Sequence, residues 1–358
     1  MLVSDAVAAV LADFGADTVF GVVGSGNFHV TNALVARGAR FVAARHECGA
    51  ASMADGWARL SGRPGILSVH QGPGLTNAVT GITEAAKSRT PMVVLAADVA
   101  ASAIRSNFRI DVAELASSIG AVPARLHSPD FAVDDTIRAY RTAVVERQTV
   151  VLALPLDVQA AECPVPPAEL LETARAGLAD KREPLAGPAR DQARGPGPRA
   201  QLIREAAGPE ATSHLADAIR GAQRPVFIAG RGARNARART QLEQLAGRCG
   251  ALLATSAAAK GLFRGSPWDL DVSGGFASPL AAELIRGADL VVGWGSSLNM
   301  WTMRHGSLIS PGTVVAQVDD EPSALGGHRP INLGVLGDIA DVASDVSAAW
   351  GDEVVTGY

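Results

Sequence analysis

Aromatic and charged residues are scarce in this sequence. Of its 358 residues, 4% are aromatic and 19% are charged, and the formal net charge at pH 7 is −4. Surfaces that bind nucleic acids are usually basic, because lysine and arginine neutralise the phosphates. The chain has no basic stripe and an acidic balance. We therefore expect no nucleic-acid partner.

Long hydrophobic runs are also lacking. No apolar run reaches the length of about 20 residues that a transmembrane helix needs. The first 17 residues carry acidic side chains in an amphipathic helical pattern, whereas a signal peptide needs a basic head and an unbroken apolar core. These features predict a cytoplasmic protein with no membrane partner.

Cysteine is rare, with three residues at Cys48, Cys163 and Cys249. Their spacing matches no paired metal-ligand motif, and an odd number suits a reducing compartment better than a disulfide framework. We expect no metal site built by these residues. Hydrophobic residues make up 47% of the chain, and its length allows two domains, each with its own core.

Short apolar runs alternate with helical patterns along both halves of the chain. A helix that Ser4 or Asp5 could cap comes first, and a capped helix from Asp130 comes late in the first half. The predicted strands are 18–23, 41–44, 65–70, 92–97, 121–126, 149–154, 225–229, 251–254, 290–294, 314–319 and 333–336. This alternation predicts an α/β fold with doubly wound parallel sheets. An antiparallel α+β domain would need hairpin turns, which the sequence lacks.

A proline-rich segment separates the two halves. Prolines are scattered among Ala, Arg and Glu over residues 161–211, a composition typical of a linker. We therefore predict one domain over residues 1–160 and a second over residues 212–358.

Polar residues and glycines follow two of the predicted strands in the first domain. Arg45-His46-Glu47 comes after the run at 41–44, and His70-Gln71-Gly72-Pro73-Gly74 ends the run at 65–70. The carboxyl ends of parallel strands line the crevice where ligands bind. Glu47, His70 and the glycine loop are therefore expected to meet at one place.

Several linked motifs resemble those of thiamine diphosphate enzymes. Arg45-His46-Glu47, the Ala-Asp-Gly-Trp-Ala-Arg run at 54–59 and Gly72-Pro73-Gly74-x-x-Asn77 resemble the pyrimidine-binding domain of the acetolactate synthase and 2-keto-acid decarboxylase superfamily. The runs at 224–232, 288–295 and 333–338 resemble that superfamily's middle domain. The resemblance covers nearly the whole chain outside the predicted linker.

The resemblance implies thiamine diphosphate as the cofactor. Glu47 would hydrogen-bond the ring nitrogen of the aminopyrimidine and so activate the cofactor; the alternative is a glutamate that only caps a helix. Gly72, Pro73, Gly74 and Asn77 would lie against the pyrimidine, and a plain turn is the alternative for this loop.

The same resemblance assigns a substrate pocket. Its members would be Ser25, His29, His70 and Gln71. His70 falls where members similar to benzoylformate decarboxylase carry a pocket histidine, so it would relay protons to the substrate carboxylate or the adduct. A core histidine with satisfied hydrogen bonds is the alternative, and Ser25 could instead stabilise its own loop.

The family's diphosphate-binding motifs do not occur in the 358 residues. These motifs are a Gly-Asp-Gly and an Asn-Asn pair about thirty residues further along. In the family they belong to a third domain that binds the diphosphate through Mg²⁺. The resemblance therefore implies a split enzyme that decarboxylates a 2-keto acid or transfers the acyl anion. A separate subunit would hold Mg²⁺ and the diphosphate, in a hetero-oligomer built on pyrimidine-domain pairs. The rivals are a non-catalytic scaffold or regulatory subunit, and a truncated gene product.

Two segments of the second half bear on nucleotide cofactors. Gly295–Trp301 lacks the arginine with which some synthases contact a flavin, so no FAD is expected. Gly230-Arg231-Gly232 follows a predicted strand, as in dinucleotide sites, but a lone Gly-x-Gly is a weak signal. A tight strand-to-helix turn is the favoured interpretation.

Overall fold

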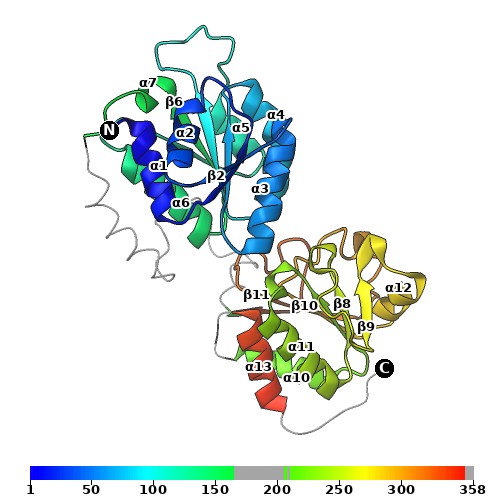
Figure 1. Ribbon diagram of the computed structural model, residues 1–358. Coiled ribbons are helices and arrows are strands. Elements are labelled where there is room, and N and C mark those ends of the chain that lie inside the picture. The colour runs from blue at the N-terminus through cyan, green and yellow to red at the C-terminus, as the bar shows by residue number, and fades with distance from the viewer. Residues whose placement is uncertain (165–204, 207, 209, 351–358) are drawn as a thin grey trace, which may run out of the picture. The chain divides into compact units, whose positions relative to one another are not determined.

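The computed structural model describes residues 1–164, 205, 206, 208 and 210–350. Contacts divide the chain into two compact units, Met1–Ala189 and Arg190–Tyr358 (Figure 1). Most of the predicted linker lies outside the described residues. None of the helices in the described part of the chain combines the length and apolar character that crossing a membrane requires.

The first unit contains a six-stranded sheet in the order β2-β1-β3-β4-β6-β5, and every neighbouring pair is parallel. Its strands are β1 Thr18–Gly21, β2 Arg40–Ala43, β3 Gly65–Val69, β4 Met92–Asp98, β5 Val122–Arg125 and β6 Thr149–Pro155. All six predicted strands are present, with ends that differ by a few residues.

Helices cover both faces of this sheet (Figure 1). They are α1 Val3–Asp13, α2 Phe28–Ala36, α3 Glu47–Ser61, α4 Pro73–Lys87, α5 Val112–Ser118, α6 Ala132–Val145 and α7 Leu156–Gln159. Along β4, Val93 and Leu95 join a core cluster with α1, α2 and α6, whereas Val94 and Ala96 join one with α3, α4 and α5. Burial on both faces explains why the strands read as continuous apolar runs, and it confirms the doubly wound prediction.

Two predicted helix caps in this unit are wrong, because the residues that precede α1 and α6 are Leu2 and Phe131. Helix α1 begins at Val3, so Asp5 lies inside it, where its carboxylate accepts the Leu2 N–H at 3.2 Å. Helix α6 follows Phe131, and Asp130 makes no capping bond there. A polar residue near a helix start is a weak boundary signal, because helix ends fray and are defined only to within one or two residues.

The second unit repeats the architecture, with a parallel sheet in the order β12-β11-β10-β7-β8-β9. Its strands are β7 Pro225–Ala229, β8 Leu252–Thr255, β9 Asp269–Val272, β10 Leu290–Trp294, β11 Val314–Asp319 and β12 Leu333–Leu336, and its helices are α10 Ala211–Gly221, α11 Ala236–Cys249, α12 Pro279–Arg286 and α13 Ile339–Trp350. Sequence reasoning missed β9 and α12. Strand β9 is an edge strand in which only Val272 is buried, so it has no apolar run to reveal it.

The Gly230-Arg231-Gly232 segment forms a tight turn after β7. The Gly230 N–H donates to the Trp294 carbonyl at 2.8 Å, and the Gly232 N–H donates to the Gly295 carbonyl at 3.1 Å. These bonds join the loops that follow β7 and β10, which are neighbours in the sheet. The loops after β7 and β10 pack so closely that a side chain at position 230 or 232 would clash with Gly295, which accounts for the two glycines.

Candidate functional site

Glu47 is the first residue of α3, just beyond the carboxyl end of β2. His46 caps the helix by accepting the Cys48 N–H on Nδ1 at 3.2 Å. An acidic side chain in the first turn is stabilised by the free N–H groups of the helix. The half-buried Glu47 carboxylate accepts a hydrogen bond from Asn77 Nδ2 on Oε2 at 3.1 Å. Among the described residues, Oε1 has no such donor.

The glycine loop brings α4 up to this carboxylate. Gly72 precedes α4 with a φ of 59°, and a Cβ there would lie 2.6 Å from the Phe108 carbonyl oxygen, so only glycine fits. Pro73 is exposed at the first helical position. A Cβ on Gly74 would lie 2.9 Å from His70 Cβ and 3.6 Å from Glu47 Oε1. Gly74 therefore sits between His70 and Glu47.

His70 lies directly after β3 and is half-buried. Its Nδ1 accepts the Gly26 N–H at 3.1 Å, and its ring meets the Phe108 ring edge-on with centroids 5.4 Å apart. Burial lowers the pKa of His70 below its ordinary value, and the Glu47 carboxylate opposes part of that shift. His70 is therefore biased toward its neutral form.

The remaining pocket candidates differ in exposure. Ser25 is exposed within the loop that contacts His70. His29 is exposed in the first turn of α2, where its ring packs on Phe28 with centroids 5.4 Å apart. Gln71 is buried, with its Oε1 close under Gly26, and that oxygen has no hydrogen-bond partner among the described residues.

The structure thus brings most of the predicted site residues together and sets two apart. Asn77 hydrogen-bonds Glu47, and Gly74 lies close to both Glu47 and His70. Gln71 lies beneath the loop rather than on its surface, and no contact joins His29 to Glu47 or His70 in the described part of the chain. The expected meeting of the two strand ends is present.

Three residues that sequence reasoning missed help to build the site. Asn27 is fully buried and holds the loop before α2. Gln159 Nε2 donates to the Leu154 carbonyl at 2.7 Å and to the Gly26 carbonyl at 3.3 Å. Phe108 covers Gly72 and His70. An asparagine before a helix is typical of a cap, but the Asn27 side chain makes no capping bond to α2 and bonds the preceding loop and Ser68 instead. The Gln159 and Phe108 contacts are far apart in sequence and carry no local signal.

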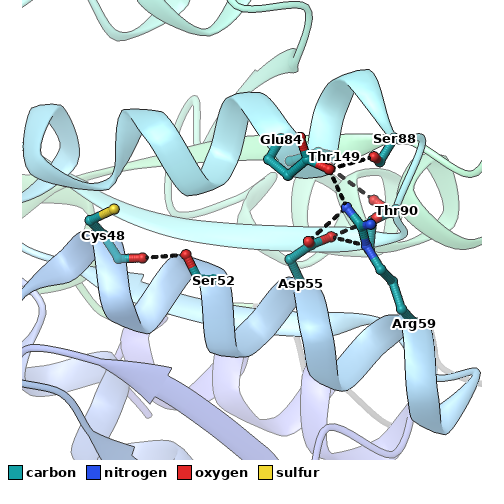
Figure 2. A network of polar contacts seen from close by, with 8 residues as sticks. All are labelled: Cys48, Ser52, Asp55, Arg59, Glu84, Ser88, Thr90 and Thr149. Carbon is teal, nitrogen blue, oxygen red and sulfur yellow. Dashed lines mark hydrogen bonds and ion pairs between the residues drawn. The ribbon is translucent and has the colours of Figure 1, made fainter. Parts of the chain in front are cut away.

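The Ala-Asp-Gly-Trp-Ala-Arg run carries a polar network on α3, near the starts of β4 and β6 (Figure 2). Asp55 Oδ1 accepts from Thr90 Oγ1 at 2.7 Å and from Arg59 Nε at 2.9 Å, while Oδ2 pairs with Arg59 at 2.7 Å. Arg59 also reaches Glu84 on α4 at 2.9 Å, and Thr149 Oγ1 donates to the Thr90 carbonyl at 2.9 Å. The network ties α3 to α4 and to the starts of β4 and β6.

A cavity of about 910 Å³ also lies in the first unit, away from Glu47. Its lining includes Asp98, Arg109, Arg125 and His127 but neither Glu47 nor His70.

The residues around Glu47 fit the aminopyrimidine of thiamine diphosphate. A flat heteroaromatic ring needs a glycine surface to lie on and a carboxylate oxygen to hydrogen-bond its ring nitrogen. Gly74 supplies such a surface next to Glu47 Oε1, which lacks a protein donor among the described residues. The fold and site therefore define an α/β protein with a carboxylate and a glycine loop at the carboxyl ends of two strands of the same parallel sheet.

Comparison with known proteins identifies the family. Residues 1–115 match the thiamine pyrophosphate enzyme N-terminal TPP binding domain, and residues 212–346 match the thiamine pyrophosphate enzyme central domain. The chain belongs to the thiamine pyrophosphate enzyme family, whose cofactor these domains imply.

Several curated relatives align with nearly the whole chain. "Probable 2-ketoarginine decarboxylase AruI" of Pseudomonas aeruginosa is 32% identical over 93% of this chain and 55% of its own length. The sulfoacetaldehyde acetyltransferase of Rhodobacter capsulatus is 28% identical over 98% of this chain and 56% of its own length. The acetolactate synthase of Mycobacterium bovis is 26% identical over 96% of this chain and 53% of its own length. The chain thus spans about half the length of these relatives.

Proposed function

We propose that this chain is the pyrimidine-binding and central component of a split thiamine diphosphate enzyme that acts on a 2-keto acid. The observation that carries the proposal is the Glu47 carboxylate, oriented by Asn77 beside Gly74 and His70. The names of the relatives, which include a decarboxylase and an acetolactate synthase, support decarboxylation or carboligation as the reaction class.

Glu47 would hold a proton at the aminopyrimidine ring nitrogen. When bound, thiamine diphosphate supplies a nucleophilic carbon and an electron sink for keto-acid chemistry. Glu47 Oε1 lies near Gly74 and accepts no hydrogen bond from the described residues, while Asn77 donates to Oε2. One carboxylate oxygen is thereby fixed by the protein and the other is left for the cofactor, which orients the group before the cofactor binds.

His70 and Ser25 would act on the substrate side. His70 is half-buried and biased toward its neutral form, so at neutral pH its ring N–H would donate a hydrogen bond to the substrate carboxylate or the reacting group. Ser25 is exposed on the adjoining loop and can hydrogen-bond the substrate.

A separate polypeptide would hold the diphosphate and Mg²⁺. The chain spans about half the length of these relatives, and its 358 residues contain neither Gly-Asp-Gly nor Asn-Asn. Diphosphate binding needs backbone donors at a helix start and oxygen ligands for the metal. The assembly would be a hetero-oligomer built on paired pyrimidine-binding domains.

The test combines this chain with a candidate diphosphate-domain chain, thiamine diphosphate, Mg²⁺ and pyruvate. Carbon dioxide release is measured for the wild type, for Glu47→Gln and for Glu114→Gln, an exposed glutamate of α5 that serves as the matched control. We expect Glu47→Gln to lower kcat by about 100-fold or more, as for loss of an acid–base group, and Glu114→Gln to have no effect.

The same experiment separates the proposal from a scaffold role. A scaffold or regulatory subunit predicts a partner that is active alone and is indifferent to Glu47→Gln. Full activity of the Glu47→Gln complex would therefore refute the catalytic assignment.

A further inference from the structure

The loop 24–27 is built directly onto the His70 ring. A Cβ on Gly24 would lie 2.8 Å from His70 Cγ, and one on Gly26 would lie 1.6 Å from Gln71 Oε1. Backbone at both positions therefore packs against the residues that follow β3. The Gly26 N–H donates to His70 Nδ1 at 3.1 Å.

Asn27 fixes the position of this loop. Its side chain is fully buried, and its Oδ1 accepts the Gly24 N–H at 2.8 Å. Its Nδ2 donates to the Val22 carbonyl at 3.1 Å and to Ser68 Oγ at 3.0 Å. Asn27 thereby ties the loop to β3, two residues before His70. Three bonds from one buried amide hold a short loop far more rigidly than its glycines would allow alone.

The Gly26 contact determines which His70 nitrogen carries the proton. A backbone N–H can only donate, so Nδ1 must present its lone pair, and a neutral His70 then carries its proton on Nε2. The imidazolium form would set an Nδ1–H against the Gly26 N–H. Glu47 at the start of α3 is the ionisable group whose charge acts on His70, and it favours the protonated form. Gly24, Gly26, Gly74 and Phe108, which also contact the ring or its Cβ, do not titrate.

We propose that Asn27 is a positioning residue that keeps His70 neutral with its proton on Nε2, by holding the Gly26 N–H against Nδ1. The role of this tautomer in catalysis rests on the proposed function, since it makes His70 a hydrogen-bond donor through Nε2. The tautomer itself is a property of this chain.

The experiment reads the tautomer directly in the full 358-residue chain, without partner or cofactor. Long-range ¹H–¹⁵N NMR spectra of ¹⁵N-histidine-labelled protein distinguish the two neutral forms, and His70→Gln assigns the His70 signals. We expect wild-type His70 in the Nε2–H form. In Asn27→Ala, we expect the Nδ1–H form to increase about fivefold, as for the loss of one hydrogen bond, and the pKa of His70 to rise.

Two further variants keep the test decisive. Asn235→Ala removes an asparagine that accepts the Ala238 N–H at 2.7 Å in the second unit, so it should leave the His70 signals unchanged. Ser68→Ala removes one of the three Asn27 bonds and should shift the tautomer in the same direction by a smaller amount; it decides the matter if Asn27→Ala does not fold. The proposal would be overturned if folded Asn27→Ala kept the wild-type tautomer and pKa of His70. It would also be overturned if His70 in the wild type carried its proton on Nδ1.

A catalytic readout separates this inference from the proposed function. In the assembled enzyme, the acid limb of the kcat/KM profile should move to higher pH in Asn27→Ala and stay in place in Asn235→Ala. An acid limb that does not move in Asn27→Ala would overturn the positioning role. A failed split-enzyme proposal would show itself through Glu47→Gln and would leave the NMR result standing.

Discussion

Replacing Arg59 by alanine should destabilise the first unit by about 3 kcal/mol. Asp55 is buried, with 7% of the residue exposed. The replacement removes its hydrogen bond from Arg59 Nε and its ion pair with Arg59, and among the described residues it leaves the hydrogen bond from Thr90. Hydrogen bonds to charged groups contribute about 1.5–3 kcal/mol each, and breaking a buried ion pair costs about 3–5 kcal/mol. The Arg59 side chain is 22% exposed, so water compensates part of the loss.

The Arg59–Glu84 pair adds little to this value. The Glu84 side chain is 63% exposed, and pairs of this kind contribute about 0–1 kcal/mol. Arg59→Lys should give an intermediate loss, because an ammonium group cannot contact both Asp55 oxygens in the same planar arrangement. The matched control is Arg237→Ala, which removes an exposed pair with Asp341 in the second unit and should cost less than about 1 kcal/mol.

Hydrogen exchange followed by mass spectrometry is the suitable assay, because it reports α3, α4 and β4 separately from the second unit. We expect Arg59→Ala to reduce the free energy of opening in these elements while the second unit keeps its protection. A loss in Arg59→Ala no larger than that in Arg237→Ala would refute the reasoning, since it would mean that Asp55 is satisfied without its arginine.

Two further predictions concern helix packing and cysteine reactivity. Gly81→Ala should destabilise the first unit by about 1–3 kcal/mol, because its Cβ would lie 2.5 Å from Ala51 Cβ. Gly56 has open space around it, so Gly56→Ala should stabilise α3 by about 0.5–1 kcal/mol. Thermal unfolding measures both variants, and a shift of the melting temperature in the same direction for both would contradict the packing argument. Burial raises the pKa of Cys249 to about 12, so iodoacetamide at pH 8 should label the part-exposed Cys48 well before Cys249, and mass spectrometry that finds equal labelling would contradict the burial argument.

Local sequence signals were sufficient for most strands and for the location of the site. Buried parallel strands are continuous apolar runs, so their positions can be found without a structure. Glu47 and the Gly72–Gly74 loop were identified because each follows such a run. Strand β9 was missed because an edge strand with one buried residue has no such pattern. The start of α1 was placed too late because Asp5 interacts from inside the first turn.

The contacts that build the candidate site join residues that are far apart in sequence. The bond from Gly26 to His70 spans 44 positions, and the bond from Asn27 to Ser68 spans 41. Nothing in the sequence near His70 specifies which nitrogen is protonated. The burial of Gln71 beneath the loop was equally invisible, because a glutamine at a strand end is usually expected to face solvent.

The sequence by itself determined the two α/β units, the family resemblance and the position of Glu47 after a strand, because apolar periodicity and motif spacing are local properties. Only the tertiary structure decided how Asn77 orients Glu47, how Asn27 and Gly26 hold His70, and how Arg59 ties α3 to α4. These are interactions between groups that approach within about 3 Å only after the sheet has assembled, and hydrogen-bond geometry at that range is not encoded in any one stretch of chain.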